Sequence, residues 1–100
     1  MTAYVVTEVQ VLDEDRANEY RKLANPSYAK YGGRYLARGG RVEVVEGEST
    51  ERKLIIIEFP SWERAQEWYA SPEYAEALKL GEGALDRRVR IVEGTDSPVP

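Results

Sequence analysis

Two arginines stand between two pairs of glycines in residues 31–41, which read YGGRYLARGGR. An arginine side chain presents a planar fork of N–H donors that matches the two oxygens of a carboxylate. Neighbouring glycines let another group approach the backbone closely. Arg38, followed directly by Gly39 and Gly40, is therefore a candidate clamp for a carboxylate or an enolate. The alternative is an ion pair between Arg38 and an acidic residue of a second subunit.

Tyr20 and Tyr31 lie on either side of Asn25-Pro26 in a predicted helix. Because proline removes one backbone donor, we expect the helix to kink or restart there and to leave a gap above the sheet. A phenolic hydroxyl in that gap would orient a carbonyl group or stabilise an oxyanion. The alternative is that both are ordinary core tyrosines with satisfied hydroxyls. The expected cleft is bounded by Tyr20, Tyr31 and Arg38.

Two further candidates come from the second half of the chain. Glu58 stands near the end of an apolar run and is a candidate general base, or else part of an interface ion pair or a solvent-facing strand end. Tyr69 belongs to a group of aromatic residues at helical spacing, most of them expected in the core or in dimer contacts and one or two in an apolar pocket wall. The predicted ligand-binding residues are thus Tyr20, Tyr31, Arg38, Glu58 and Tyr69, and no catalytic residue is predicted.

The 100 residues contain no histidine and no cysteine. Zinc, copper and haem sites therefore lack their usual protein ligands. Ser-His-Asp and Cys-His catalysis are excluded for the same reason. We expect no metal site and no cofactor, so any chemistry has to use Asp, Glu, Tyr, Lys, Arg or Ser, or the reactivity of the bound molecule itself.

Composition indicates one globular domain, since 42% of the residues are hydrophobic and 32% are charged. We place this domain at residues 1–94, followed by a flexible tail over residues 95–100. The net charge is −4 and basic residues alternate with acidic ones, which argues against nucleic-acid binding. No apolar run approaches the ~20 residues of a spanning helix, and the N-terminus lacks the basic start of a secretory signal. We therefore expect a cytoplasmic protein with no membrane partner.

The predicted elements alternate in type along the chain. Strands are expected over residues 3–11, 34–46, 53–59 and 87–93, the second of them interrupted by a bulge or tight turn at Gly39-Gly40. Asp13, Ser61 and Ser71 are expected to cap helices, and Gly32 or Gly33 to end the first one. The order β-α-β-β-α-β predicts an α+β, ferredoxin-like fold, with a four-stranded antiparallel sheet covered by helices on one face.

The third strand carries an unbroken apolar run, Leu54 to Ile57, where a half-exposed sheet would show alternation. Val5-Val6 in the first strand repeats this feature. One layer of helices cannot cover both faces of the sheet, and exposed apolar patches of that size usually mark an interface. We therefore expect a homodimer that packs two sheets face to face.

The chain resembles a bacterial family known as domain of unknown function thirteen-thirty (DUF1330), of the dimeric α/β-barrel superfamily. The resemblance rests on residues 31–36, 38–40, 58–61, 68–69 and 71–74, in that order along the chain. It implies a ferredoxin-like subunit that pairs as a dimeric α/β barrel. Members often carry histidine where this chain has Tyr31, which puts any imidazole-dependent role in question. Relatives by fold include cofactor-free monooxygenases of aromatic polyketides and small lactone isomerases, while the family itself has no established reaction.

These observations lead to two functional hypotheses. The first is a homodimer that binds a small acidic or aromatic organic molecule between the sheet and the first helix, with oxygenase or isomerase chemistry that needs no cofactor. The second is a non-catalytic accessory or interaction dimer, whose tyrosines and arginines are structural.

Overall fold

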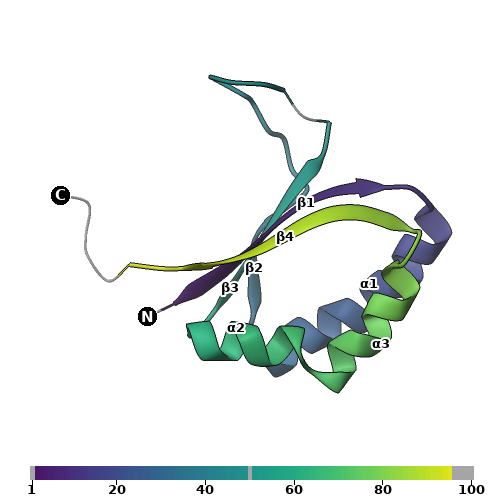
Figure 1. Ribbon diagram of the computed structural model, residues 1–100, viewed down its shortest axis with the longest axis vertical. Coiled ribbons are helices and arrows are strands. Elements are labelled where there is room, and N and C mark those ends of the chain that lie inside the picture. The colour runs from purple at the N-terminus through teal and green to yellow at the C-terminus, as the bar shows by residue number, and fades with distance from the viewer. Residues whose placement is uncertain (1, 50, 96–100) are drawn as a thin grey trace.

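The computed structural model describes residues 2–49 and 51–95. Its four strands and three helices follow in the order β1 (Ala3–Val11), α1 (Glu14–Lys30), β2 (Arg34–Arg38), β3 (Lys53–Phe59), α2 (Trp62–Tyr69), α3 (Pro72–Gly81) and β4 (Leu85–Glu93). The strands form one antiparallel sheet in the order β2-β3-β1-β4, and the helices lie together on one side of it (Figure 1). The sheet is open, and the fold is the predicted ferredoxin-like one. No helix in the described ranges is both long enough and apolar enough to span a membrane.

The helix boundaries follow the expected capping residues. Side-chain oxygens of Asp13, Ser61 and Ser71 accept hydrogen bonds from backbone N–H groups three residues further on, at 3.1–3.2 Å. Gly32 ends α1 with a φ of 82°, a left-handed conformation that favours glycine. Its N–H donates to the carbonyl oxygen of Ala29. The capping bonds therefore define where the three helices begin and where α1 ends.

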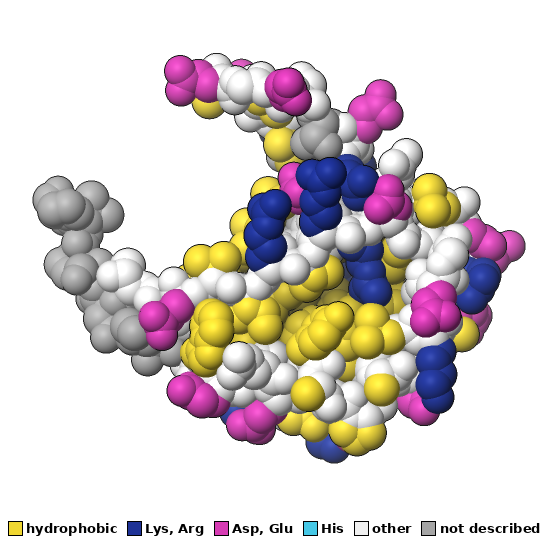
Figure 2. All heavy atoms as spheres, viewed as in Figure 1, with side chains coloured by type: hydrophobic (Ala, Val, Ile, Leu, Met, Phe, Trp, Pro, Cys, Tyr) yellow, Lys and Arg dark blue, Asp and Glu magenta, His cyan; other side chains and the backbone are white. Residues whose placement is uncertain are grey.

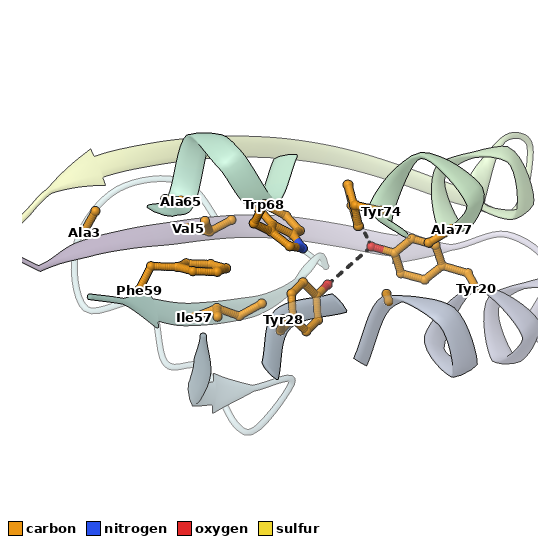
Figure 3. Close-up of a cluster of buried hydrophobic side chains, with 11 residues drawn as sticks. Ala3, Val5, Tyr20, Tyr28, Ile57, Phe59, Ala65, Trp68, Tyr74 and Ala77 are labelled. Atoms are coloured by element: carbon orange, nitrogen blue, oxygen red, sulfur yellow. Dashed lines mark hydrogen bonds between the residues drawn. The ribbon is translucent and has the colours of Figure 1, made fainter. Parts of the chain in front are cut away.

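The core lies between the helices and one face of the sheet. Val5, Ile57 and Phe59 contribute from the central strands, and Trp68 and Tyr74 from α2 and α3, each at most 2% exposed (Figure 3). On the opposite face Leu36 and Val92 are 48% and 47% exposed. None of the described helices or strands covers this opposite face, as the apolar run in β3 predicted.

Two local predictions are wrong. Helix α1 continues through Pro26 without a break, and Pro26 lies on its exposed side, where water can reach the carbonyl that proline leaves unpaired. Strand β2 ends at Arg38, and the expected continuation over residues 42–46 is not a strand. Those residues belong to a loop that projects away from the sheet (Figure 1), so they have no neighbouring strand to pair with. Most of the predicted tail, residues 96–100, lies outside the described residues.

Candidate functional site

A cavity of about 460 Å³ lies between α1 and the helix-facing side of the sheet. Val5, Val9 and Ile55 line it from the central strands. Figure 2 shows the hollow, with hydrophobic side chains on its walls and Lys or Arg side chains near its rim. The volume falls within the range of roughly 300–1,000 Å³ that is typical of small-molecule sites.

Three tyrosine hydroxyls and one arginine meet at this cavity. The hydroxyl of Tyr20 lies 2.8 Å from that of Tyr74 and 3.4 Å from that of Tyr28 (Figure 3). Nη1 of Arg87 donates to the hydroxyl oxygens of both Tyr20 and Tyr74, at 2.9 Å each. The four side chains come from α1, α3 and β4, so the site depends on the packing of all three elements.

Local sequence explains how these side chains converge. Tyr20, Ala24 and Tyr28 recur every four residues and therefore share the buried face of α1. Tyr74 stands in the first turn of α3, next to the Ser71 cap. Gly81, at the other end of α3, leaves room for the ring of Tyr20, because a Cβ atom there would lie 3.2 Å from that ring.

Burial keeps the three hydroxyls protonated. Desolvation raises the pKa of Tyr20, of Tyr28 and of Tyr74 far above that of a free tyrosine, and Arg87 offsets only part of this effect. The cluster therefore offers neutral O–H groups beside a fixed positive charge. Such groups stabilise negative charge on a bound oxygen without themselves reacting.

Arg38 reaches the cavity because of a β-bulge. The register between β2 and β3 shifts between Tyr35 and Ala37, so that Tyr35 pairs with Ile57 and Arg38 with Ile55. Directly paired residues share a face, and both isoleucines face the helices. The bulge therefore places Tyr35 and Arg38 on the same, helix-facing side, whereas simple alternation predicts opposite sides. The hydroxyl of Tyr35 is held by the side-chain oxygen of Asn25 at 2.6 Å.

The cavity is lined by more positive than negative side chains. The cations are Arg21, Arg38, Lys53 and Arg87, and the carboxylates are Glu14 and Glu51. Glu14 lies 3.6 Å from Arg21, and both carboxylates are exposed. Within the described part of the chain, Arg38, Lys53 and Arg87 form no ion pair with a carboxylate. This excess of positive charge favours an anionic ligand.

The structure brings two of the five predicted residues, Tyr20 and Arg38, to the cavity. Tyr31 does not line it and does not bound the expected cleft, because α1 is unbroken and its last turn directs Tyr31 toward α3. The hydroxyl of Tyr31 donates to Glu73 at 2.9 Å, and Glu73 also pairs with Lys30. This arrangement lowers the pKa of Glu73, with the bond from Lys30 as the largest cause.

Glu58 and Tyr69 also lie away from the cavity. Glu58 pairs across the sheet with Arg34, and their side chains form an ion pair of 3.0 Å. The sequence left Glu58 as a general base, part of an interface ion pair or a solvent-facing strand end. The geometry matches an ion pair, but one formed within the chain and not across an interface. Tyr69 is 46% exposed at the last residue of α2.

Sequence reasoning missed Arg87 and Lys53 and placed Tyr28 only in a helical pattern. One signal for Arg87 is available, because it lies between Leu85 and Val89 in an alternating strand whose apolar side faces the core. No comparable signal marks Tyr28, since a tyrosine on a buried helical stripe is usually a core residue.

Comparison with known proteins supports the fold and names a family. The model of the family described as "Domain of unknown function (DUF1330)" matches residues 2–95. No curated protein matches the chain. The RPA0582 protein of unknown function from Rhodopseudomonas palustris is similar in structure, with a TM-score of 0.76 and 17% sequence identity over 96% of this chain and 84% of that one.

Two other solved structures share the fold at lower similarity. A dimeric protein of unknown function with a ferredoxin-like fold, from Bacteroides fragilis, has a TM-score of 0.59 and 14% identity over 93% of this chain and 96% of its own. A proposed antibiotic biosynthesis monooxygenase from Nitrosomonas europaea has a TM-score of 0.54 and 11% identity over 94% and 91% of the two chains. Identities this low support a shared fold and nothing more.

Proposed function

The chain belongs to the DUF1330 family, and from that premise we propose that it binds a small acidic, aromatic organic molecule between α1 and the sheet. The observation that carries the proposal is Arg87. Its guanidinium is partly buried at the cavity, bonds two neutral phenols and has no carboxylate partner among the described residues. A buried charge is costly unless a partner compensates it, so a ligand carboxylate or enolate would stabilise this arrangement.

The remaining cavity wall suits an aromatic ring. Tyr28, Tyr35 and Trp68 all line the cavity, with the ring centroids of Tyr28 and Tyr35 5.6 Å apart and those of Tyr28 and Trp68 5.2 Å apart. Aromatic side chains gain from edge-to-face or offset contacts with another ring. Arg38 and Lys53, both exposed, would attract the anion as it enters.

We extend the proposal to a reaction class, cofactor-independent oxygenase or isomerase chemistry. Such reactions pass through an enolate or a phenolate of the substrate, and the phenols with Arg87 are donors placed to stabilise it. The Nitrosomonas neighbour, described as a monooxygenase, makes this class worth testing. One observation supports the alternative, a non-catalytic binding or accessory dimer. The two carboxylates that line the cavity, Glu14 and Glu51, are both exposed, so neither lies deep in the cavity, where it could act as a base.

We also propose that the protein works as a homodimer through the open sheet face. Tyr4, Val6, Leu54 and Ile56 are partly exposed there, and Leu36 and Val92 more so. A second copy would cover this face and leave the cavity on the other side of each sheet free. The dimeric Bacteroides neighbour has the same fold, which supports this assembly.

Binding of 2-naphthoate, measured by calorimetry and by thermal shift, tests the proposed function. We expect a concentration-dependent rise in melting temperature for the natural protein. Arg87→Gln keeps a polar group of similar reach but removes the charge, and we expect it to weaken binding by tenfold or more, since bonds to charged groups contribute about 1.5–3 kcal/mol. Arg41→Gln, which removes a charge from a residue that does not line the cavity, is the control.

Two results would contradict binding. Either no aromatic acid binds the natural protein, or the Arg87 and Arg41 variants bind 2-naphthoate equally well. Turnover of lactones and quinols, followed by NMR and oxygen uptake, then separates an enzyme from a binding protein.

A further inference from the structure

The hydroxyl of Tyr28 ends a chain of hydrogen bonds whose last hydrogen has no acceptor in the described protein. Three phenols carry three hydroxyl hydrogens, and only two oxygen–oxygen contacts join them, Tyr20 to Tyr74 and Tyr20 to Tyr28. Each contact uses one hydrogen. Arg87 cannot take the third, because a guanidinium only donates. One hydroxyl hydrogen of the cluster is therefore left over.

Arg87 determines which hydrogen this is. Its Nη1 donates to the oxygens of Tyr20 and Tyr74 but makes no bond to Tyr28. Either oxygen of each pair can donate. Because positive hydroxyl hydrogens are most stable when they point away from the guanidinium, the favoured direction has Tyr20 donating to Tyr28, which Arg87 does not contact. Tyr20 then has no hydrogen left, so its contact with Tyr74 uses the hydrogen of Tyr74. In this direction the oxygen of Tyr20 accepts two bonds, which its lone pairs allow. The unused hydrogen then belongs to Tyr28.

We propose that the Tyr28 hydroxyl donates this hydrogen to a carboxylate oxygen of the ligand, so that the acidic group binds at the tyrosine cluster and not at the exposed Arg38 near the rim. Tyr28 lines the cavity and is 9% exposed, so it is largely shielded from bulk water. The relay from Arg87 polarises each hydroxyl in turn and makes the last one a stronger donor. A neutral donor beside a partly buried cation selects an anion over a neutral group of the same shape. This inference rests on the proposed function, because it names where that ligand is held.

Two probes of matched shape test the proposal, 2-naphthoate and the neutral ketone 2-acetylnaphthalene. Tyr28→Phe removes the terminal hydroxyl and keeps the ring. We expect it to weaken the binding of 2-naphthoate by about tenfold and that of the ketone by at most about threefold, because hydrogen bonds to charged groups are roughly twice as strong as those to neutral groups. Tyr74→Phe is the matched control, since it leaves the bond from Tyr20 to Tyr28 in place. We expect it to weaken either probe by less than about threefold.

A measurement on the unmodified sequence does not depend on how a variant folds. In protein labelled with ¹³C at tyrosine Cζ, saturating 2-naphthoate is expected to shift the Tyr28 signal more than the Tyr20 or Tyr74 signals. The inference is overturned if Tyr28→Phe binds 2-naphthoate like the natural protein, or if the Tyr28 signal does not move. If Arg87→Gln still weakens binding in that case, the proposed function survives and only the role of Tyr28 is lost. If no aromatic acid binds at all, both fail.

Discussion

The guanidinium carbon of Arg38 lies 4.5 Å from the ring centroid of Tyr35, three residues before it on the same strand. Residues three apart on a regular strand point to opposite faces, so this contact exists only because of the bulge in β2. The stacked pair keeps a cation at the mouth of the cavity although the arginine remains exposed. The contact places the guanidinium over the face of the ring, at the distance of a cation–π interaction.

Replacing Arg38 by lysine keeps the charge but removes the planar stacking. We expect Arg38→Lys to change the affinity for 2-naphthoate by less than about twofold, because the charge that attracts the anion is kept, and to lower the free energy of unfolding by about 0.5–1 kcal/mol, the size of an exposed cation–π contact. Calorimetry and urea unfolding measure the two quantities, with Arg41→Lys as the control. A tenfold loss of affinity in the Arg38 variant would show that the acidic group binds at this arginine, and an unchanged free energy of unfolding would show that the contact with Tyr35 does not stabilise the fold.

The sheet and its helices were predictable from local signals. The caps Asp13, Ser61 and Ser71 and the stop at Gly32 act within one helical turn, and each is where the sequence placed it. The absence of alternation in β3 also predicted an open face, which residues 2–49 and 51–95 leave without a covering helix. Interactions of this kind depend on residues close in sequence or on one repeating pattern.

The site was less predictable, because it depends on contacts between distant segments. Arg87 meets Tyr20 across 67 positions of sequence, and no spacing rule connects a strand arginine to a helix tyrosine. The face of Arg38 depends on a bulge whose position alternation does not reveal. The prediction for Tyr31 failed because a tyrosine beside glycines suggested a cleft. In the structure its hydroxyl donates to Glu73 of α3, which holds it away from the cavity.

Alkaline pH is expected to destabilise the fold through the tyrosine cluster. Burial raises the pKa of Tyr20, Tyr28 and Tyr74, whereas a tyrosine in the unfolded chain ionises at about pH 10. Their contribution to stability is therefore fully present below pH ~10 and is lost as the pH rises toward the folded-state pKa, because the unfolded chain releases protons that the folded protein keeps. In that range each such tyrosine lowers the free energy of unfolding by up to about 1.4 kcal/mol per pH unit.

Urea unfolding between pH 9 and 11 measures this slope, and the difference between natural protein and Tyr28→Phe isolates one group from the lysines that titrate in the same range. We expect the variant to lose less stability per pH unit. Identical slopes, or phenolate absorbance from the cluster while the protein is still folded near pH 10, would contradict the assignment.

Gly33 is expected to tolerate no side chain. A Cβ atom there would lie 2.8 Å from the ring of Phe59 and 3.1 Å from the carbonyl oxygen of Tyr28, both in the packed core. We expect Gly33→Ala to lower the free energy of unfolding by about 1–3 kcal/mol, as overpacking usually does. Gly40→Ala is the control, because nothing lies within 4 Å of a Cβ at that position. Equal stability of the two variants in urea would show that the ring of Phe59 moves aside at no cost.

The proposed dimer makes the open sheet face the most sensitive surface of the protein. Ile56 lies near the middle of that face, on β3 and paired with Val6 of β1. A lysine there would have its charge buried between two sheets, at a cost well above the ~1 kcal/mol of an ordinary surface change. We expect Ile56→Lys to convert a dimer into a monomer at micromolar concentration while circular dichroism stays unchanged.

Val45→Lys adds the same charge at a valine that is 83% exposed on the projecting loop, and it is expected to leave the assembly intact. Light scattering gives the mass of each form. An interface of standard size, about 1,600 Å², is large enough to persist at this concentration. If the natural protein scatters as a single chain, the proposed dimer is wrong and the apolar face has no partner. If only the Val45 variant loses the dimer, the interface lies on the loop and not on the sheet.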